Sequence, residues 1–141
     1  MTVVLRVLVV SAEAEDHRWL LRVLQPQGHR VDSAFTQREA SDRLRQDSFE
    51  LILCERDLSD GTWKDVLHSA DILDRRPALI VISRLANDCL WAEVLNVGGD
   101  DVLSKPLNAR EVSWAISSAA TRWERSPDVL KAQMQTPGAP D

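Results

Sequence analysis

The stretch LILCERDLSDG, residues 51–61, runs four apolar residues directly into a carboxylate and then into a loop of Asp, Ser and Gly. A short apolar run bounded by turn residues is typical of a strand buried on both faces of a parallel sheet. Similar runs occupy residues 5–10 and 78–82, and weaker ones occupy 29–33 and 101–104. These segments predict five strands.

Helical stretches lie between the expected strands, and several begin with a polar residue placed three positions before an acid, the spacing of an N-terminal cap. The pairs are Thr36 with Glu39, Thr62 with Asp65, and Asn108 with Glu111. Asn87 is a candidate cap for a further helix, and the first helix is expected over about residues 14–25. Strands that alternate with helices through short loops predict an α/β, doubly wound fold with a parallel sheet covered on both faces.

Composition limits the functions that this chain can serve. With 141 residues, 44% of them hydrophobic, the chain fits one domain, which we expect over residues 1–125, followed by a flexible tail over residues 126–141. The formal net charge is −5 and the basic residues are scattered, so nucleic acid is not an expected partner. The apolar N-terminal segment is short and broken by Arg6, which argues against a signal peptide or a membrane span.

The cysteines and the loops argue against two other classes of protein. Cys54 and Cys89 match neither a disulfide framework nor a zinc site, so the cytoplasm is the expected compartment. A flavodoxin-like cofactor binder needs a phosphate cradle after the first strand, whereas the segment SAEAED, residues 11–16, presents three acids there. No oriented nucleophile triad is evident either. We therefore expect no cofactor and no enzymatic activity.

Ligand sites in doubly wound sheets lie at the carboxyl ends of the strands. The residues that follow the expected strands are Ser11, Ala12 and Glu13 after the first, Glu55 after the third, Ser83 after the fourth, and Lys105 and Pro106 after the fifth. These are the candidate site residues.

The sequence resembles the receiver domain of bacterial two-component response regulators over about residues 5–124. The motifs that carry the resemblance are RVLVV at 6–10, LIVIS at 79–83 and GGDDVLSKPLNAREV at 98–112. The resemblance implies a flavodoxin-like (βα)5 fold with a five-stranded parallel sheet of order 2-1-3-4-5. It also implies a site in which an acid pair holds a divalent cation, an aspartate accepts phosphate, and a hydroxyl and a lysine contact the phosphoryl group.

Compared position by position, the site is only partly retained. Ser83 stands at the hydroxyl position and Lys105 at the lysine position, but the acid pair falls on Ser11 and Ala12, and Glu55 replaces the aspartate. With the paired acids gone, the resemblance predicts no metal site, because Mg²⁺ draws its charge compensation from carboxylates.

The expected function is that of an atypical receiver, a pseudo-receiver, which acts by protein–protein interaction without conventional Mg²⁺-dependent phosphorylation. A Glu55–Lys105 ion pair could partly imitate the phosphorylated state, or it could be the remnant of a drifted site. The alternative is a phosphorylatable receiver in a phosphorelay with Glu55 as an unusual acceptor. Glu13 could then substitute as a metal ligand, although we expect it to be a solvated acid at a helix start.

An interaction module needs a surface, and two of the five tryptophans are candidates for it. Trp91 and Trp114 fall off the apolar stripes of their helices, and we expect Leu90 beside Trp91 to point outward too. The resemblance implies that these residues lie on the face formed by the fourth helix, the fifth strand and the fifth helix. That face is expected to bind a histidine kinase, an effector protein or a second copy of the chain.

Overall fold

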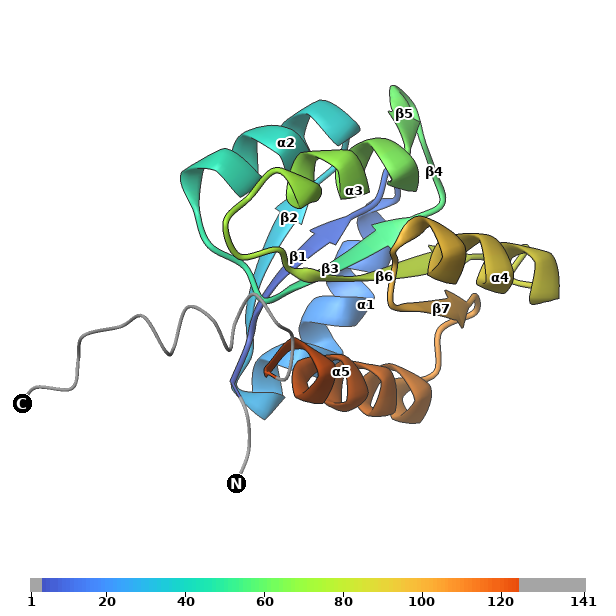
Figure 1. Ribbon diagram of the computed structural model, residues 1–141. Helices are drawn as coiled ribbons and strands as arrows, with labels where there is room; N and C mark the ends of the chain where they lie inside the picture. Colours follow the sequence, from blue (N-terminus) through green and yellow to red (C-terminus); the bar gives the residue numbers. More distant parts are fainter. Residues whose placement is uncertain (1–3, 125–141) are drawn as a thin grey trace, which may run out of the picture.

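The computed structural model describes residues 4–124 and forms a three-layer α/β fold (Figure 1). The central sheet consists of β1 (Arg6–Val10), β2 (Arg30–Ala34), β3 (Leu51–Glu55), β6 (Ala78–Ser83) and β7 (Asp101–Ser104). All neighbouring strands in it are parallel, and the order is β2-β1-β3-β6-β7. Counted along the chain without the small hairpin β4–β5, this is the predicted order 2-1-3-4-5. The expected tail lies outside the described residues.

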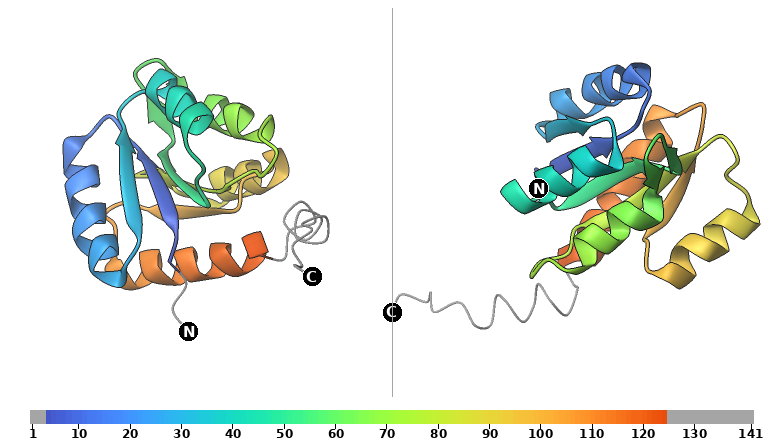
Figure 2. Two further views of the ribbon diagram at one scale, coloured as in Figure 1. Left: turned by 90° about the vertical axis from the view of Figure 1, so that its left-hand side faces the viewer. Right: turned by 90° about the horizontal axis from the view of Figure 1, so that it is seen from above.

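Within residues 4–124, five α-helices cover the two faces of the sheet (Figure 2). They are α1 (Ala14–Leu24), α2 (Gln37–Gln46), α3 (Trp63–Asp71), α4 (Asp88–Val97) and α5 (Ala109–Glu124), with a 3₁₀ turn, η1 (Gln25–Gln27), after α1. Helices α1 and α5 pack on one face, and α2, α3 and α4 pack on the other (Figure 1).

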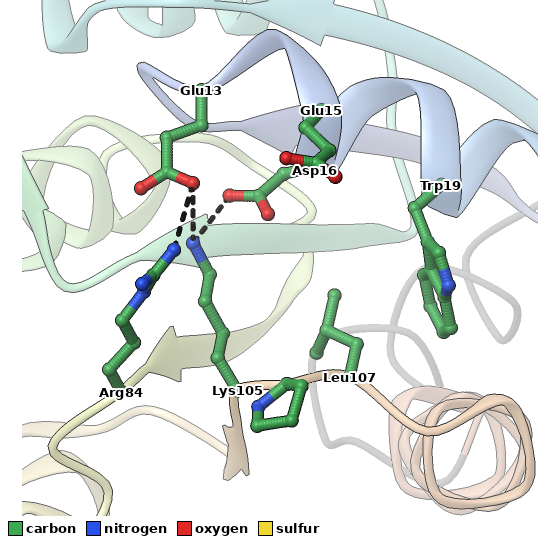
Figure 3. A pocket seen from close by; sticks show the side chains of 8 residues that line it. Glu13, Glu15, Asp16, Trp19, Arg84, Lys105 and Leu107 are labelled. Carbon is green, nitrogen blue, oxygen red and sulfur yellow. Dashed lines mark hydrogen bonds and ion pairs between the residues drawn. The ribbon is translucent and has the colours of Figure 1, made fainter.

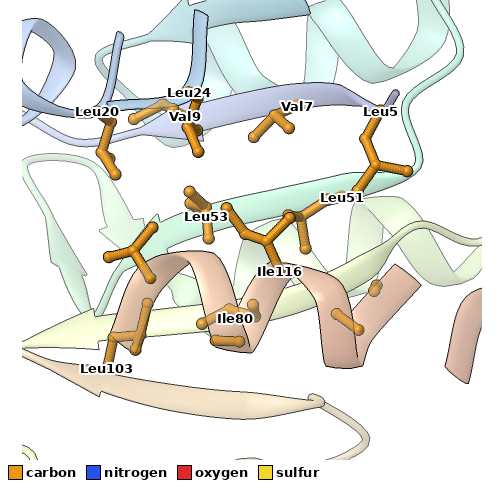
Figure 4. Close-up of a cluster of buried hydrophobic side chains, with 14 of the residues drawn as sticks. Leu5, Val7, Val9, Leu20, Leu24, Leu51, Leu53, Ile80, Leu103 and Ile116 are labelled. Carbon is orange, nitrogen blue, oxygen red and sulfur yellow. The ribbon is translucent and has the colours of Figure 1, made fainter. Parts of the chain in front are cut away.

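Each strand supplies both layers of the core, because alternate side chains point to opposite faces of a sheet. Val7 and Val9 of β1 face α1 and α5, where they meet Leu20 and Ile116 (Figure 4). Leu8 and Val10 belong to the other core, together with residues of α2, α3 and α4. The interior strands are buried on both faces, which explains their nearly continuous apolar sequences.

The predicted helix starts are confirmed. The Thr36 hydroxyl accepts a hydrogen bond from the Glu39 N–H at 3.1 Å, and Thr62 forms a capping box with Asp65. The side-chain oxygen of Asn87 accepts a hydrogen bond from the Leu90 N–H at 2.9 Å. These caps satisfy backbone donors that a helix start leaves without a partner.

The expected orientation of α4 is wrong in part. Leu90, which we expected to point outward, is 6% exposed and packs in the core with Val94, whereas Ala92 and Leu95 are exposed. The helix sequence DCLWAEVLNV is apolar on almost every side, so its pattern does not fix which stripe faces the sheet. Trp91 does point outward, with 51% of its surface exposed.

The other tryptophans behave as follows. Trp63 is buried, Trp19 is partly buried against the α1–α5 core, and Trp114 is 69% exposed. Trp123 lies where the side chains are outside the description. Within residues 4–124, no helix is both long and apolar enough to cross a membrane.

Candidate functional site

The candidate site lies where β1, β3, β6 and β7 end. Glu55 is the last residue of β3, Ser83 is the last residue of β6, and Lys105 follows β7 directly. Ser11 follows β1 and is fully buried, whereas the neighbouring Ala12 is exposed. The parallel sheet thus brings the predicted residues to one edge, although they are far apart in the sequence.

The Lys105 ammonium group is the centre of an ion-pair cluster. Its Nζ atom lies 2.5 Å from Asp16 Oδ2, 3.1 Å from Glu55 Oε1 and 3.7 Å from Glu13 Oε2. Only 5% of the Lys105 side chain is exposed, against 11% for Asp16 and 18% for Glu55. Figure 3 shows the lysine reaching toward Glu13 and Asp16 at the start of α1.

The Ser11 hydroxyl joins two of these carboxylates. Its Oγ atom lies 2.7 Å from Asp16 Oδ2 and 3.0 Å from Glu55 Oε2, and it accepts a hydrogen bond from the Glu13 N–H at 3.1 Å. A serine has one hydroxyl proton, so Asp16 and Glu55 share a single donor here. Ser11 therefore supplies no charge, but it fixes the two acids that do.

The structure corrects the expected loss of acids. Sequence reasoning left Glu55 as the only carboxylate of the site, whereas Glu13, Asp16 and Glu55 offer oxygens that all lie within 4.8 Å of one another. Glu13, expected to be a solvated acid, is partly exposed at 41% but pairs with both Lys105 and Arg84. The two additional acids come from the loop and the first turn of α1 rather than from the two positions directly after β1.

A signal for Asp16 was present in the sequence. Asp16, Leu20 and Leu24 recur every four residues, and all three are buried on the inner side of α1. An acid that falls on the apolar stripe of a helix faces the interior, where it needs a partner. Because side chains of a helix lean toward its N-terminus, Asp16 points back to the strand ends and meets Lys105 there.

Burial and charge act in opposite directions on Lys105. Burial alone would lower its pKa, but the hydrogen bonds to Asp16 and Glu55, together with the charges of those carboxylates, raise the pKa above its usual value. The side chain is therefore an ammonium ion at neutral pH.

The donor chemistry of the cluster suits a hard divalent cation, because three carboxylates converge. The Lys105 ammonium group, however, already contacts all three of them. A cation that used Glu13, Asp16 and Glu55 together would have to displace Lys105. The residues thus fit such an ion as ligands, but in competition with an internal positive charge.

Ser83 is buried, with 6% of its surface exposed, and its Oγ accepts a hydrogen bond from the Leu85 N–H at 3.0 Å. The Lys105–Pro106 peptide bond is cis. Ser83 and Lys105 are also linked through the backbone, because the Lys105 N–H donates to the Ser83 carbonyl at 3.0 Å.

The loop after Glu55 folds into a small hairpin, β4 (Asp57–Leu58) and β5 (Gly61–Thr62). At its tip, the Asp60 carboxylate accepts hydrogen bonds from the N–H groups of Gln37 at 2.7 Å and Arg38 at 3.1 Å. These donors belong to the first turn of α2, so Asp60 ties the hairpin to that helix. Mainly because of the bond from Gln37, the pKa of Asp60 is lowered.

The second candidate surface is formed by α4, β7 and α5. A cavity of about 440 Å³ on it is lined by Asp101, Val102, Leu103, Arg110, Glu111, Trp114 and Ala115. Trp114 and residues of the edge strand β7 therefore line the same cavity. On α4, Glu93 pairs with Lys64 of α3, and Trp91 lies about 160° around the helix from Glu93. Trp91 is therefore on the side of α4 away from α3, and Leu90 is not part of this surface.

Solved structures of other proteins share the fold of this chain. No family model matches the sequence, and curated protein sequences give no match. Among solved structures, a signal receiver domain from Vibrio parahaemolyticus superposes with a TM-score of 0.81 at 20% identity, covering 94% of this chain and 98% of that one. A CheY-like receiver domain protein from Methanospirillum hungatei gives a TM-score of 0.78 at 22% identity, covering 87% and 98%.

A two-component response regulator from Clostridium difficile has a higher identity of 26%, with a TM-score of 0.74, covering 86% of this chain and 98% of that one. These matches cover nearly the whole length of the solved domains. This chain has the fold of response-regulator receiver domains.

Proposed function

We propose that this chain is a signalling receiver module which acts by protein–protein interaction and does not undergo conventional Mg²⁺-dependent phosphorylation. The observation that carries the proposal is the state of Glu55. One of its carboxylate oxygens contacts the Lys105 ammonium group, and the other lies within hydrogen-bonding distance of the Ser11 hydroxyl. Both oxygens of the acceptor position are therefore engaged.

A phosphoryl acceptor has to present a carboxylate oxygen in line with the leaving group. Glu55 has one methylene more than aspartate, which shifts that oxygen by about 1 Å or more, and a displacement of this size can reduce a rate roughly 10²-fold. Displacing Lys105 to admit a metal ion would add a further cost, because the lysine is almost fully buried among its partners. Both effects favour a module held in one state.

The interaction surface of the module is proposed to be the α4–β7–α5 face. Trp91 and Trp114 are exposed there, and aromatic side chains are frequent anchors at protein interfaces. The partner would be a histidine kinase, an effector protein or a second copy of the chain, in the cytoplasm. Trp91→Ala and Trp114→Ala should each weaken partner capture or self-association, whereas Ile72→Ala, an exposed apolar residue at the end of α3, should not.

One observation favours the alternative function, a phosphorylatable receiver in a phosphorelay. Glu13, Asp16 and Glu55 together provide the carboxylates that a divalent cation requires. If the cation displaced Lys105, Glu55 could act as the acceptor, and the freed lysine could contact the phosphoryl group.

Intact-mass spectrometry separates the two functions. The protein is incubated with a small phosphodonor and Mg²⁺, beside a Glu55→Gln variant that lacks the acceptor carboxylate. We expect no mass gain in either protein. A gain of one phosphoryl group in the wild type that is absent from Glu55→Gln would establish the alternative.

A further inference from the structure

A pocket of about 400 Å³ lies beside the ion-pair cluster, between α1 and the segment that follows β7 (Figure 3). We call it the Trp19 pocket. Its lining residues are Glu13, Glu15, Asp16, Trp19, Arg84, Lys105, Pro106 and Leu107. Three carboxylates and two cations leave the lining with one net negative charge, and Glu55 next to Lys105 adds another.

The two ends of the pocket differ in chemistry. Trp19, Pro106 and Leu107 form an apolar end, and Figure 3 shows Leu107 between Lys105 and Trp19. Glu13 and Glu15 lie at the acidic end. Glu15 and Trp19 are four residues apart on α1, so the carboxylate and the indole ring are neighbours on the helix surface. Such a site suits a ligand with an aliphatic stem and a positively charged head.

The carboxylates of the pocket are not equally neutralised. Lys105 is held by Asp16 and Glu55 at 2.5 and 3.1 Å, so its charge is already compensated. Glu15 is exposed, and within residues 4–124 it makes no ion pair or side-chain hydrogen bond. Glu13 pairs at 3.4 Å with Arg84, whose side chain is 72% exposed. An exposed pair of this kind is weak and can be exchanged.

We propose that the Trp19 pocket binds an arginine side chain of a protein partner, with the guanidinium group at Glu13 and Glu15 and the stem along Trp19. Arginine fits better than lysine, because its planar group can stack on an indole face while it donates to carboxylates. The contact between Arg84 and Glu13 is an internal example of guanidinium binding at this rim. A partner's arginine would take the place of Arg84, which is free to move into solvent.

This inference goes beyond the proposed function, because it adds a second contact surface, formed by α1 and the segment after β7, to the α4–β7–α5 face. It does not depend on whether Glu55 accepts phosphate. The proposed function and the proposed arginine site can also be disproved independently of each other. The mass measurement reports only on phosphorylation, and the titration described next reports only on the pocket.

The test is an NMR titration of the ¹⁵N-labelled full chain with N-acetyl-arginine amide, which has an uncharged backbone and keeps the guanidinium group. N-acetyl-citrulline amide, a neutral isostere, is the ligand control. We expect saturable shifts at the Glu13–Asp16 amides and the Trp19 indole, with a dissociation constant of about 1 mM for so small a ligand. The citrulline derivative should produce no saturable shift.

Three variants place the binding in the pocket. Glu15→Gln should weaken the arginine ligand about threefold, the range of an exposed charge contact. Asp74→Asn, which removes the same charge from an exposed loop between α3 and β6, should have no effect. Arg84→Ala should strengthen binding, because the internal competitor is gone. The proposal would be overturned if N-acetyl-arginine amide showed no saturable binding, or if N-acetyl-citrulline amide bound equally well. It would also be overturned if the shifts lay away from α1, or if Glu15→Gln and Asp74→Asn had equal effects.

Discussion

Replacing Lys105 by methionine tests the role of the buried ammonium group. The substitution keeps most of the apolar stem but leaves Asp16, Glu55 and Glu13 facing one another without a positive charge. Breaking a buried ion pair by removing one partner typically costs about 3–5 kcal/mol. Glu55 and Glu13 retain 18% and 41% exposure, which allows water to screen them, so we expect the lower end, about 3 kcal/mol.

The assay is urea unfolding at pH 7, followed by circular dichroism, with Lys64→Met as the matched control. Lys64 also forms a short ion pair, 2.8 Å from Glu93, but the two side chains are 50% and 42% exposed. Its loss should therefore cost no more than about 0.5 kcal/mol. Adding Glu55→Gln to Lys105→Met should recover about 1 kcal/mol, because one of the opposing charges is removed. A loss below about 1 kcal/mol for Lys105→Met would refute this account of the cluster.

Four further predictions concern pH and Mg²⁺. The pKa of Lys105 is raised in the folded protein, so its ion pairs stabilise the fold fully at pH values below the unfolded pKa of about 10.4. This stabilisation is lost as the pH rises through the folded pKa. Lys105→Met should not show this alkaline loss of stability. Burial lowers the pKa of His29, whose Nδ1 accepts the Leu5 N–H, so stability should fall as the pH drops below about 6.5, and His29→Gln should flatten that fall in pH-dependent melting curves. Asp60→Asn should lower the melting temperature at neutral pH and remove the acid-dependent loss of stability near the Asp60 pKa, because the charged acceptor for the first N–H groups of α2 is gone. Isothermal titration should show that Mg²⁺ binds more tightly to Lys105→Met than to the wild type, since the competing ammonium group is absent; equal affinity would argue that the ion does not use this cluster.

The fold could be predicted from local patterns, because buried parallel strands and capped helices leave strong signals. The segment 101–104 was predicted with its observed bounds, and the other four strands were displaced by one residue at most at either end. Thr36 and Asn108 were placed correctly as caps, since their side chains act within three residues of their own position. Such interactions can be deduced without knowing the tertiary structure.

The residues that make up the site could be predicted less well, because they depend on which side of α1 faces the sheet. Ser11, Glu55 and Lys105 were placed together correctly, but Asp16 was missed even though it lies on the buried stripe of α1. The resemblance points to the two residues directly after β1, whereas this chain supplies the acid from Asp16 in the first turn of α1. Leu90 was misplaced for the same kind of reason, since an almost uniformly apolar helix does not reveal its rotation.

The central claim is that the Glu55–Lys105–Asp16 cluster holds the module in one state. Amide NMR spectra of the full chain, recorded before and after addition of Mg²⁺ and a small phosphodonor, test it most directly. We expect the resonances of α4, β7 and α5 to remain unchanged. Concerted shifts across those elements that require Glu55, and are lost in Glu55→Gln, would contradict it.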